Sequence, residues 1–113
     1  AENIVFIKLK RKQAVNPEME LFYWKDAQHH EVDFVVKDGF KVSRLIQVCW
    51  NIQDEKTKNR ETRSLAKAMK ELNVSTVKII TEDREGEEKL HDNTVKLVPL
   101  WKWLLAEENE IGS

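Results

Sequence analysis

Three strand-like segments follow one another in the first half of the chain, and this run restricts the possible folds more than any other feature. Residues 19–25 (MELFYWK), 31–37 (EVDFVVK) and 41–50 (KVSRLIQVCW) combine aromatic and β-branched side chains, which are typical of strands. Between the second and third segments, residues 37–40 (KDGF) suit a tight turn in which Gly39 can adopt a positive φ. The run therefore predicts an antiparallel meander, and the apolar end of its third strand predicts a central place in a sheet.

A long helix is expected directly after this meander. Asp54 is a good N-cap for a helix over residues 55–73, in which apolar side chains recur at helical spacing. Residues 75–81 (STVKIIT) and 94–98 (TVKLV) predict two further short strands, and the acidic segment 82–92 between them predicts an exposed hairpin or loop. The helix can thus connect the meander to a later strand of the same sheet.

The two ends of the chain differ in how clearly they predict helices. Pro99 suits the start of a helix over residues 100–108 (LWKWLLAEE), because the missing N–H of proline has no partner at that position. Residues 2–12 (ENIVFIKLKRK) fit a helix or a strand equally well by periodicity. With a helix first, the order α-β-β-β-α-β-β-α predicts an α/β fold with a mixed central sheet of four to five strands and helices on both faces.

Length and composition fit one small domain. The chain has 113 residues, of which 41% are hydrophobic, so a single domain over residues 1–113 can bury one core. One cysteine excludes an internal disulfide framework and a multi-cysteine zinc site, and it agrees with a cytoplasmic location. No apolar run approaches the roughly 20 residues of a membrane span, so no membrane partner is expected. Because the chain starts at Ala1 without Met, we expect it to be a piece of a larger protein.

Charge is balanced overall but unevenly distributed. Nineteen Lys and Arg against twenty Asp and Glu give a net charge of -1, so no general attraction to nucleic acid or anionic lipid is expected. Residues 41–74 nevertheless carry eight basic and four acidic side chains, between acidic stretches over 14–40 and 75–92. On the predicted helix, five basic residues recur at spacings of 4, 3, 4 and 3 and form one basic ridge: Lys56, Arg60, Arg63, Lys67 and Lys70. This ridge predicts contact with a nucleic-acid backbone, docking to an acidic partner, or simply a solvated face turned away from the sheet.

Several short stretches occur in a characteristic order along the chain. They are Glu2-Asn3 at the first predicted helix, Tyr23-Trp24-Lys25, Glu31–Val35 (EVDFV), Gln47-Val48-Cys49, Ile80–Asp83 (ITED) and Pro99–Leu105 (PLWKWLL). In this order they resemble the PD-(D/E)XK nuclease superfamily, and more narrowly the nuclease-like C-terminal domain of a family of prokaryotic AAA-type ATPases. The resemblance covers nearly the whole chain. It implies a restriction-endonuclease-like core in which residues 2–12 form a helix.

The resemblance also implies where a nuclease site would lie. In this superfamily acidic side chains hold a divalent cation, and the lysine of an E-x-K motif orients or deprotonates the attacking water. The matching positions make Glu2, Asp33, Gln47 and Cys49 the candidate catalytic residues, with Glu2, Asp33 and Gln47 as metal ligands. Oxygen ligands of this kind suit Mg²⁺, which would neutralise the scissile phosphate and activate water. No other cofactor is expected.

Two of these positions depart from the motif. Gln47 replaces the carboxylate of the E-x-K, so an oxygen remains but a full charge is lost, and the two acids left could hold Mg²⁺ only weakly. Cys49 replaces the lysine, and a thiol with a pKa of about 8.5 supplies no positive charge. Because a general acid–base group contributes about 10²–10⁴ to a rate, little phosphodiesterase activity should survive. A relocated base could come from the following helix, where Lys58 is the candidate.

Two tryptophans mark the last predicted helix. Trp101 and Trp103 stand two residues apart, so on a helix they lie on different sides. We expect one of them to belong to the core, and the other, if exposed, to mark an interface with another domain. Stacking against nucleic-acid bases is the alternative.

The resemblance and its departures predict a degenerate, non-catalytic nuclease-like domain. Its expected role is that of a regulatory, partner-docking or nucleic-acid-binding module of an AAA-type ATPase, with the rest of the ATPase chain and nucleic acid as the expected partners. The chain holds no GxxxxGK[ST] loop, so it cannot itself bind ATP through that motif. Two alternatives stay open: an active Mg²⁺-dependent DNA or RNA phosphodiesterase that uses Glu2, Asp33 and Gln47, and a purely structural protein-interaction domain.

Overall fold

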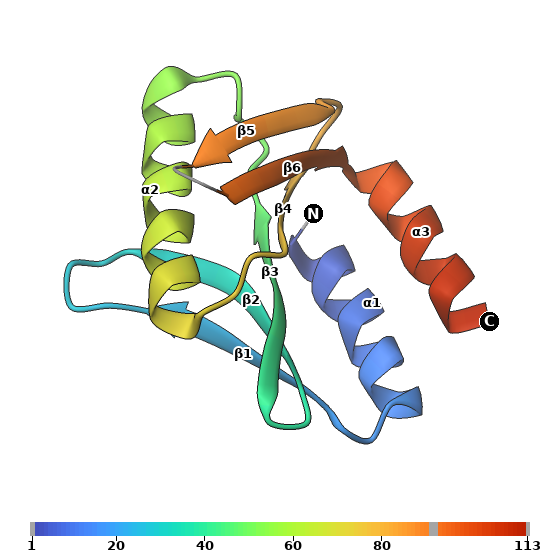
Figure 1. Ribbon diagram of the computed structural model, residues 1–113. Coiled ribbons are helices and arrows are strands. Elements are labelled where there is room, and N and C mark those ends of the chain that lie inside the picture. Colours follow the sequence, from blue (N-terminus) through green and yellow to red (C-terminus); the bar gives the residue numbers. More distant parts are fainter. Residues whose placement is uncertain (1, 91–92, 113) are drawn as a thin grey trace.

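One mixed β-sheet lies between a single helix on one face and two helices on the other (Figure 1). The computed structural model describes residues 2–90 and 93–112. In chain order the elements are α1 (Glu2–Val15), β1 (Met19–Lys25), β2 (Glu31–Asp38), β3 (Lys41–Val48), α2 (Glu55–Leu72), β4 (Val77–Thr81), β5 (Gly86–Leu90), β6 (Asn93–Pro99) and α3 (Leu100–Gly112). The expected α/β fold, with a mixed sheet and helices on both faces, is confirmed.

The meander predicted from the sequence forms one half of the sheet. β1 pairs antiparallel with β2, and β2 pairs antiparallel with β3 through the turn at Gly39, whose φ is 65°. Helix α2 then crosses one face and returns the chain to β4, which pairs parallel with β3. β4 also pairs parallel with β6, and β5 lies beyond β6 and antiparallel to it. The strand order β1-β2-β3-β4-β6-β5 therefore makes β1 and β5 the two edges.

Helix α2 begins and ends at capping residues. The carboxylate of Asp54 accepts hydrogen bonds from the backbone N–H and the hydroxyl of Thr57, so the predicted N-cap is confirmed. At the other end Asn73 adopts a left-handed conformation with φ 53°, and its backbone N–H donates to the carbonyl oxygen of Met69. These caps satisfy backbone groups that the ends of a helix leave without partners.

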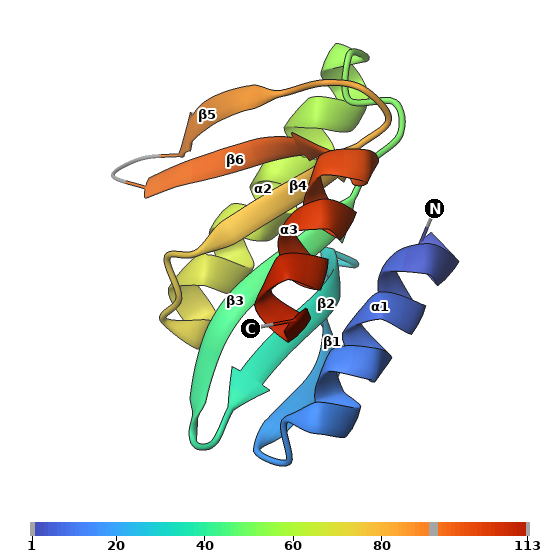
Figure 2. The same ribbon diagram turned by 90° about the vertical axis from the view of Figure 1, so that its right-hand side faces the viewer.

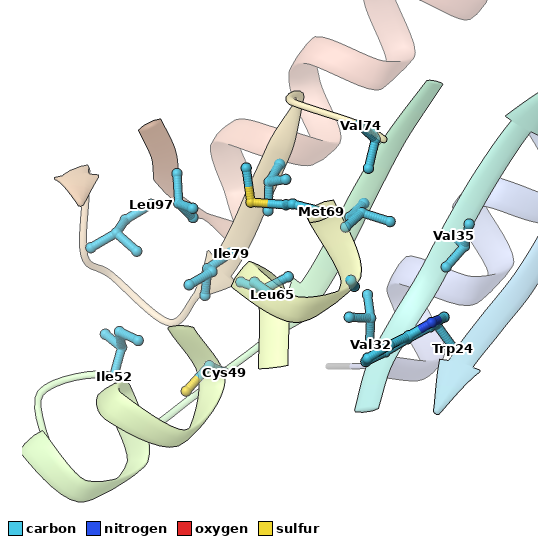
Figure 3. Close-up of a cluster of buried hydrophobic side chains, with 14 residues drawn as sticks. Trp24, Val32, Val35, Cys49, Ile52, Leu65, Met69, Val74, Ile79 and Leu97 are labelled. Carbon is cyan, nitrogen blue, oxygen red and sulfur yellow. The ribbon is translucent and has the colours of Figure 1, made fainter. Parts of the chain in front are cut away.

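A hydrophobic cluster joins α2 to the sheet. Figure 3 shows Leu65 and Met69 of α2 within this cluster, together with Ile79 of β4, Val32 of β2 and Trp24 of β1. Leu65 and Ile79 are fully buried, and burying an aliphatic side chain of this size contributes about 1.5–3 kcal/mol. The apolar side of α2 predicted from the sequence thus packs on one face of the sheet.

A second cluster joins α1 and α3 to the opposite face, where the two helices lie next to each other (Figure 2). Helix α1, which periodicity left open between a helix and a strand, buries only Val5 and Leu9. Trp103 of α3 is 1% exposed, whereas Trp101 is 60% exposed, so the prediction that one tryptophan belongs to the core is confirmed. Within the described residues, no helix is long and apolar enough to cross a membrane.

A buried carboxylate ties α1, β3 and α3 together. Glu107 of α3 is 2% exposed, accepts a hydrogen bond from Arg44 of β3, and lies 2.6 Å from the Nζ of Lys12 of α1. Burial by itself raises the pKa of Glu107, but the hydrogen bonds and charges of Arg44 and Lys12 outweigh it, so the pKa lies below its ordinary value. A charge at this depth is tolerated only with such partners, and we assign this cluster to the stability of the fold.

The segment predicted as an exposed acidic hairpin or loop contains a sixth strand, so the prediction of four to five strands was too low. Residues Gly86–Leu90 form β5, which pairs with β6. Glu87 is exposed and Glu88 is only half-buried, so this edge strand lacks the alternation of buried and exposed side chains by which strands are found in a sequence. Residues 91 and 92 of the same segment lie outside the described residues.

Candidate functional site

A bulge in β2 sets the position of Asp33. The register between β1 and β2 shifts between Phe22 and Trp24, and β2 carries the extra residue. An extra residue breaks the alternation of side chains along a strand. Val32 therefore belongs to the cluster under α2, whereas Phe34 belongs to the cluster under α1 and α3. Asp33 lies between these two residues and is half-buried.

Hydrogen bonds from β3 hold Asp33 in place. Its Oδ2 accepts the backbone N–H of Val48 at 2.9 Å, and its own backbone N–H donates to Oε1 of Gln47 at 2.8 Å. The backbone pairing of β2 with β3 begins at Phe34 and Ile46. At Asp33, the two hydrogen bonds of the Asp33 and Gln47 side chains join the strands instead. A carboxylate and an amide thus lie together at the end of β3.

Both ends of the Gln47 amide are engaged. Its Oε1 accepts the N–H of Asp33, and its Nε2 donates to the carboxylate of Glu61 on α2. Glu61 is absent from the residues that the sequence predicted for this site. One signal could have revealed it: Glu61 stands one turn before the buried Leu65, on the side of α2 that faces the sheet. A carboxylate on the buried face of a helix needs a hydrogen-bond or ion-pair partner.

The surroundings of Asp33 are acidic. Burial is the largest cause that raises the pKa of Asp33, to about 6, and the carboxylates of Glu2, Glu61 and Glu31 raise it further. The hydrogen bond from Val48 acts in the opposite direction and offsets only part of this effect. No ion-pair partner of Asp33 is found among the described residues. Glu2, at the start of α1, thus influences Asp33 electrostatically, while its role as a catalytic residue stays a prediction.

Cys49 follows the last residue of β3 and belongs to the cluster under α2 (Figure 3). It is 4% exposed, and its backbone N–H donates to the carbonyl oxygen of Ile80 at 2.9 Å. Burial raises the pKa of its thiol, and the negative charge of Glu61 raises it further. A buried, neutral thiol behaves as a small apolar side chain and supplies no positive charge.

The lysine expected to replace the one missing from the motif is paired with a glutamate of β5. Lys58, the candidate for a relocated base, lies 2.6 Å from Glu88 of β5, and this hydrogen bond raises its pKa, so it is a charged partner of β5. Within residues 2–90 and 93–112, no three His, Cys, Asp or Glu side chains are arranged to hold a metal ion. Binding of Mg²⁺ by Glu2, Asp33 and Gln47 stays a prediction.

The basic ridge of α2 is exposed along its whole length, on the side away from the sheet: Lys56, Arg60, Arg63, Lys67 and Lys70. Two of its members have acidic neighbours. Lys67 bonds Gln28 and lies 3.5 Å from a carboxylate oxygen of Asp26, and Arg60 lies 3.7 Å from Glu61. The ridge is therefore a solvated face that is partly neutralised, and contact with nucleic acid stays a prediction.

Comparison with known proteins points to one domain family. Residues 1–103 match the family described as Domain of unknown function (DUF4143), a domain found in AAA-ATPase-associated proteins. No curated protein and no solved structure matches the chain. The match runs from the start of α1 into α3 and so includes every strand of the sheet and every residue predicted for the site. The chain therefore belongs to the DUF4143 family.

Proposed function

We propose that this domain is a non-catalytic, nuclease-like module that docks a partner for an AAA-type ATPase. The proposal rests on the residue that occupies the position where the nuclease superfamily would have its lysine. Cys49 is buried there, and burial raises the pKa of its thiol. Two residues earlier, the amide of Gln47 stands in place of a carboxylate and is bonded to Asp33 and Glu61.

The charge around Asp33 favours binding over cleavage. Hydrolysis of a phosphodiester needs positive charge beside the phosphate as negative charge develops on it. Glu2 and Glu61 instead add negative charge near Asp33, and the described residues offer Asp33 no ion pair. Such a surface repels a phosphate group unless a cation binds first. It attracts a partner that carries positive charge itself.

The direct test compares the natural chain with a variant in which the motif is restored, Gln47→Glu with Cys49→Lys. Each protein is incubated with single- and double-stranded DNA and RNA in the presence of Mg²⁺ or Mn²⁺, and the products are followed with time. We expect no metal-dependent cleavage by the natural chain, because both groups of the motif are absent. Cleavage by the natural chain that disappears in Asp33→Asn would overturn the proposal.

A metal-dependent nuclease is the second candidate, and the position of Glu61 favours it. In this candidate, Glu61 of α2, which accepts a hydrogen bond from the amide of Gln47, would replace the carboxylate missing at position 47 as a metal ligand. Titration with Mg²⁺ and Mn²⁺, followed by NMR, separates the two candidates. Saturable shifts with Mg²⁺, or line broadening with the paramagnetic Mn²⁺, at Glu2, Asp33 and Glu61 that vanish in Glu61→Gln would support a metal site. The absence of shifts at millimolar metal would support docking.

A further inference from the structure

The edge strand β1 presents an aromatic surface that the fold leaves uncovered. β1 pairs with β2 alone, so within the described chain the backbone groups on its outer side have no strand partner. Phe22 and Tyr23 of β1 are 48% and 74% exposed, and Phe6 of α1 is 45% exposed. Single exposed apolar residues are ordinary, but several aromatic rings around one hollow mark a binding surface.

Residues of α1, β1 and β2 line two adjoining hollows. One hollow, of about 430 Å³, is lined by Phe6, Leu21, Phe22, Tyr23, Asp33 and Phe34. The other, of about 400 Å³, is lined by Glu2, Asn3, Phe6 and Phe34. They share Phe6 and Phe34, whose rings are stacked with their centroids 6.5 Å apart. We call the two hollows together the β1 groove.

Two carboxylates give the β1 groove its charge. Asp33 lines one hollow and Glu2 the other, and neither has an ion-pair partner among the described residues. A cation in the groove would therefore meet carboxylates and aromatic faces, both of which attract positive charge. Lys10 already lies 5.9 Å from the centre of the Phe6 ring, so the ring accepts an ammonium group on at least one side.

The opposite edge of the sheet is built differently. β5 carries Glu87, Glu88 and Lys89, and charged side chains of this kind discourage the addition of another strand. On β1 the two charged residues, Glu20 and Lys25, flank an aromatic centre. The sheet is thus protected against pairing at β5 but open to it at β1.

We infer that the β1 groove binds an extended peptide segment that adds a strand to β1 and places a basic side chain against Phe6, Asp33 and Glu2. An added strand pairs through backbone hydrogen bonds, and its alternate side chains point toward the same face. A guanidinium group can stack on an aromatic ring while it bonds a carboxylate. The inference rests on the proposed function, because a catalytic metal ion would occupy the same carboxylates.

The negative charge of the β1 groove favours a basic peptide over a nucleic acid as its ligand. Bases could stack on Phe6 and Tyr23, but their phosphates would then lie near Glu2 and Asp33, which carry no compensating ion pair among the described residues. The basic ridge could not hold those phosphates, because α2 covers the other face of the sheet (Figure 1). A peptide that brings its own positive charge has no such conflict.

The test is an NMR titration of the whole ¹⁵N-labelled chain with a capped octapeptide of alternating arginine and threonine. Its arginine side chains share one face when the peptide is extended. A matched peptide of alternating glutamate and threonine serves as the control ligand. We expect saturable shifts over residues 20–25 and at Phe6 with the arginine peptide, and none with the glutamate peptide.

Two variants in the groove and two matched controls locate the binding. Tyr23→Ala and Asp33→Asn should each weaken the arginine peptide about fivefold or more, by loss of an aromatic face and of a charge. Tyr23 is exposed, and asparagine can still accept the N–H of Val48, so both variants should fold. Phe40→Ala, at the exposed β2–β3 turn, and Glu87→Gln, on β5, should change the affinity less than about twofold.

Several results would overturn the inference. Shifts confined to α2 or to β5, no saturation at millimolar peptide, or equal affinity in Tyr23→Ala, Asp33→Asn and the natural chain would each do so. Tighter binding of a single-stranded dT decamer than of the arginine peptide at residues 20–25 would indicate base stacking instead. Metal-dependent cleavage by the natural chain is a separate outcome, because it removes the proposed function whether or not the peptide binds.

Discussion

Asp33 and Glu107 are both carboxylates set against the central sheet, but the charges around them are opposite. Glu107 accepts hydrogen bonds from Arg44 and Lys12, and these partners lower its pKa although burial alone would raise it. Asp33 has no such partner among the described residues, and burial together with nearby carboxylates, Glu2 first, raises its pKa to about 6. The fold therefore supplies cations to one carboxylate and not to the other.

This difference distinguishes a carboxylate that stabilises the fold from one that is available to a ligand. The ion pairs of Glu107 join α1, β3 and α3, and nothing more is needed to explain them. Asp33 is held in a conformation that leaves its charge uncompensated, which lowers stability at neutral pH. Uncompensated, perturbed carboxylates are typical of functional sites, and Asp33 lines the β1 groove.

The largest effect is expected when the Glu107 cluster is broken. Glu107→Ala removes the carboxylate that Arg44 and Lys12 share, and loss of one partner of a buried pair costs about 3 kcal/mol. We expect the free energy of unfolding to fall by about this amount at pH 7 in urea denaturation. Glu108→Ala is the control, because Glu108 is exposed and lies 3.6 Å from Lys8. Equal losses in the two variants would contradict a structural role that is specific to Glu107.

The same cluster predicts a dependence on pH. The pKa of Glu107 is lower in the folded than in the unfolded state, so the unfolded state takes up the proton first as the pH falls. The contribution of Glu107 is complete above the ordinary pKa of a glutamate, and it is lost as the pH falls through the folded pKa. The difference in stability between the natural chain and Glu107→Ala should therefore shrink below about pH 4.

The reactivity of the Cys49 thiol reports on burial and negative charge near Asp33. Burial and the charge of Glu61 raise the pKa of its thiol, and only the thiolate reacts readily. At pH 7.5, iodoacetamide should modify the native chain at least about tenfold more slowly than the chain in urea, as followed by mass spectrometry. Equal rates in the two states would show that Cys49 is not protected in the folded protein.

A smaller effect of opposite sign is expected at Asp33. Its folded pKa of about 6 lies above the value of 3.8 for an ordinary aspartate, so the ionised carboxylate destabilises the fold as the pH rises through this range. Because Asp33 is only half-buried, solvent screening reduces the gain expected from Asp33→Asn to about 1 kcal/mol at pH 7.5. Urea denaturation should show this gain shrinking as the pH falls from 6 toward 4. A loss of stability at pH 7.5 would place Asp33 among the structural carboxylates.

The smallest effect tests which neighbouring charges raise the pKa of Asp33. Glu2→Gln and Glu61→Gln each remove one neighbouring charge, so each should lower the pKa of Asp33 by a fraction of a unit, with Glu2→Gln the larger. Carboxyl ¹³C NMR of Asp33 against pH measures both shifts. Glu108→Gln is the matched control, since Glu108 is paired with Lys8 and is not among the charges that raise the pKa of Asp33. A pKa that does not change in either variant would leave burial and the charge of Glu31 as the causes.

The fold could be predicted where local pattern and burial agree. The three strands of the meander and the start of α2 at Asp54 follow from side-chain type, turn residues and capping. Helix α1 could not be assigned by periodicity, because only Val5 and Leu9 are buried and its apolar stripe is narrow. β5 was missed because an edge strand is held by backbone pairing, which leaves no mark on its side chains.

The site could be predicted only in part. The resemblance implied Asp33, Gln47 and Glu2; the structure places Gln47 in contact with Asp33, and Glu2 raises the pKa of Asp33 by its charge. Glu61 was missed, because its hydrogen bond to Gln47 depends on how closely α2 packs on β3. The extra residue in β2, which turns Phe34 away from the face of Val32, was also invisible in the sequence.

Helices α2 and α3, most of the strands and the two departures from the motif that the resemblance implies, Gln47 and Cys49, could be recognised in the sequence, because they depend on residue identity and on neighbours a few positions away. Which charges meet depends on how the helices and the sheet pack. Arg44 and Lys12 reach Glu107 across 63 and 95 positions of the chain, while Asp33 meets other carboxylates instead. The physical reason is that the energy of a charge depends on its burial and on its distance from other charges, and both are set by how the layers pack.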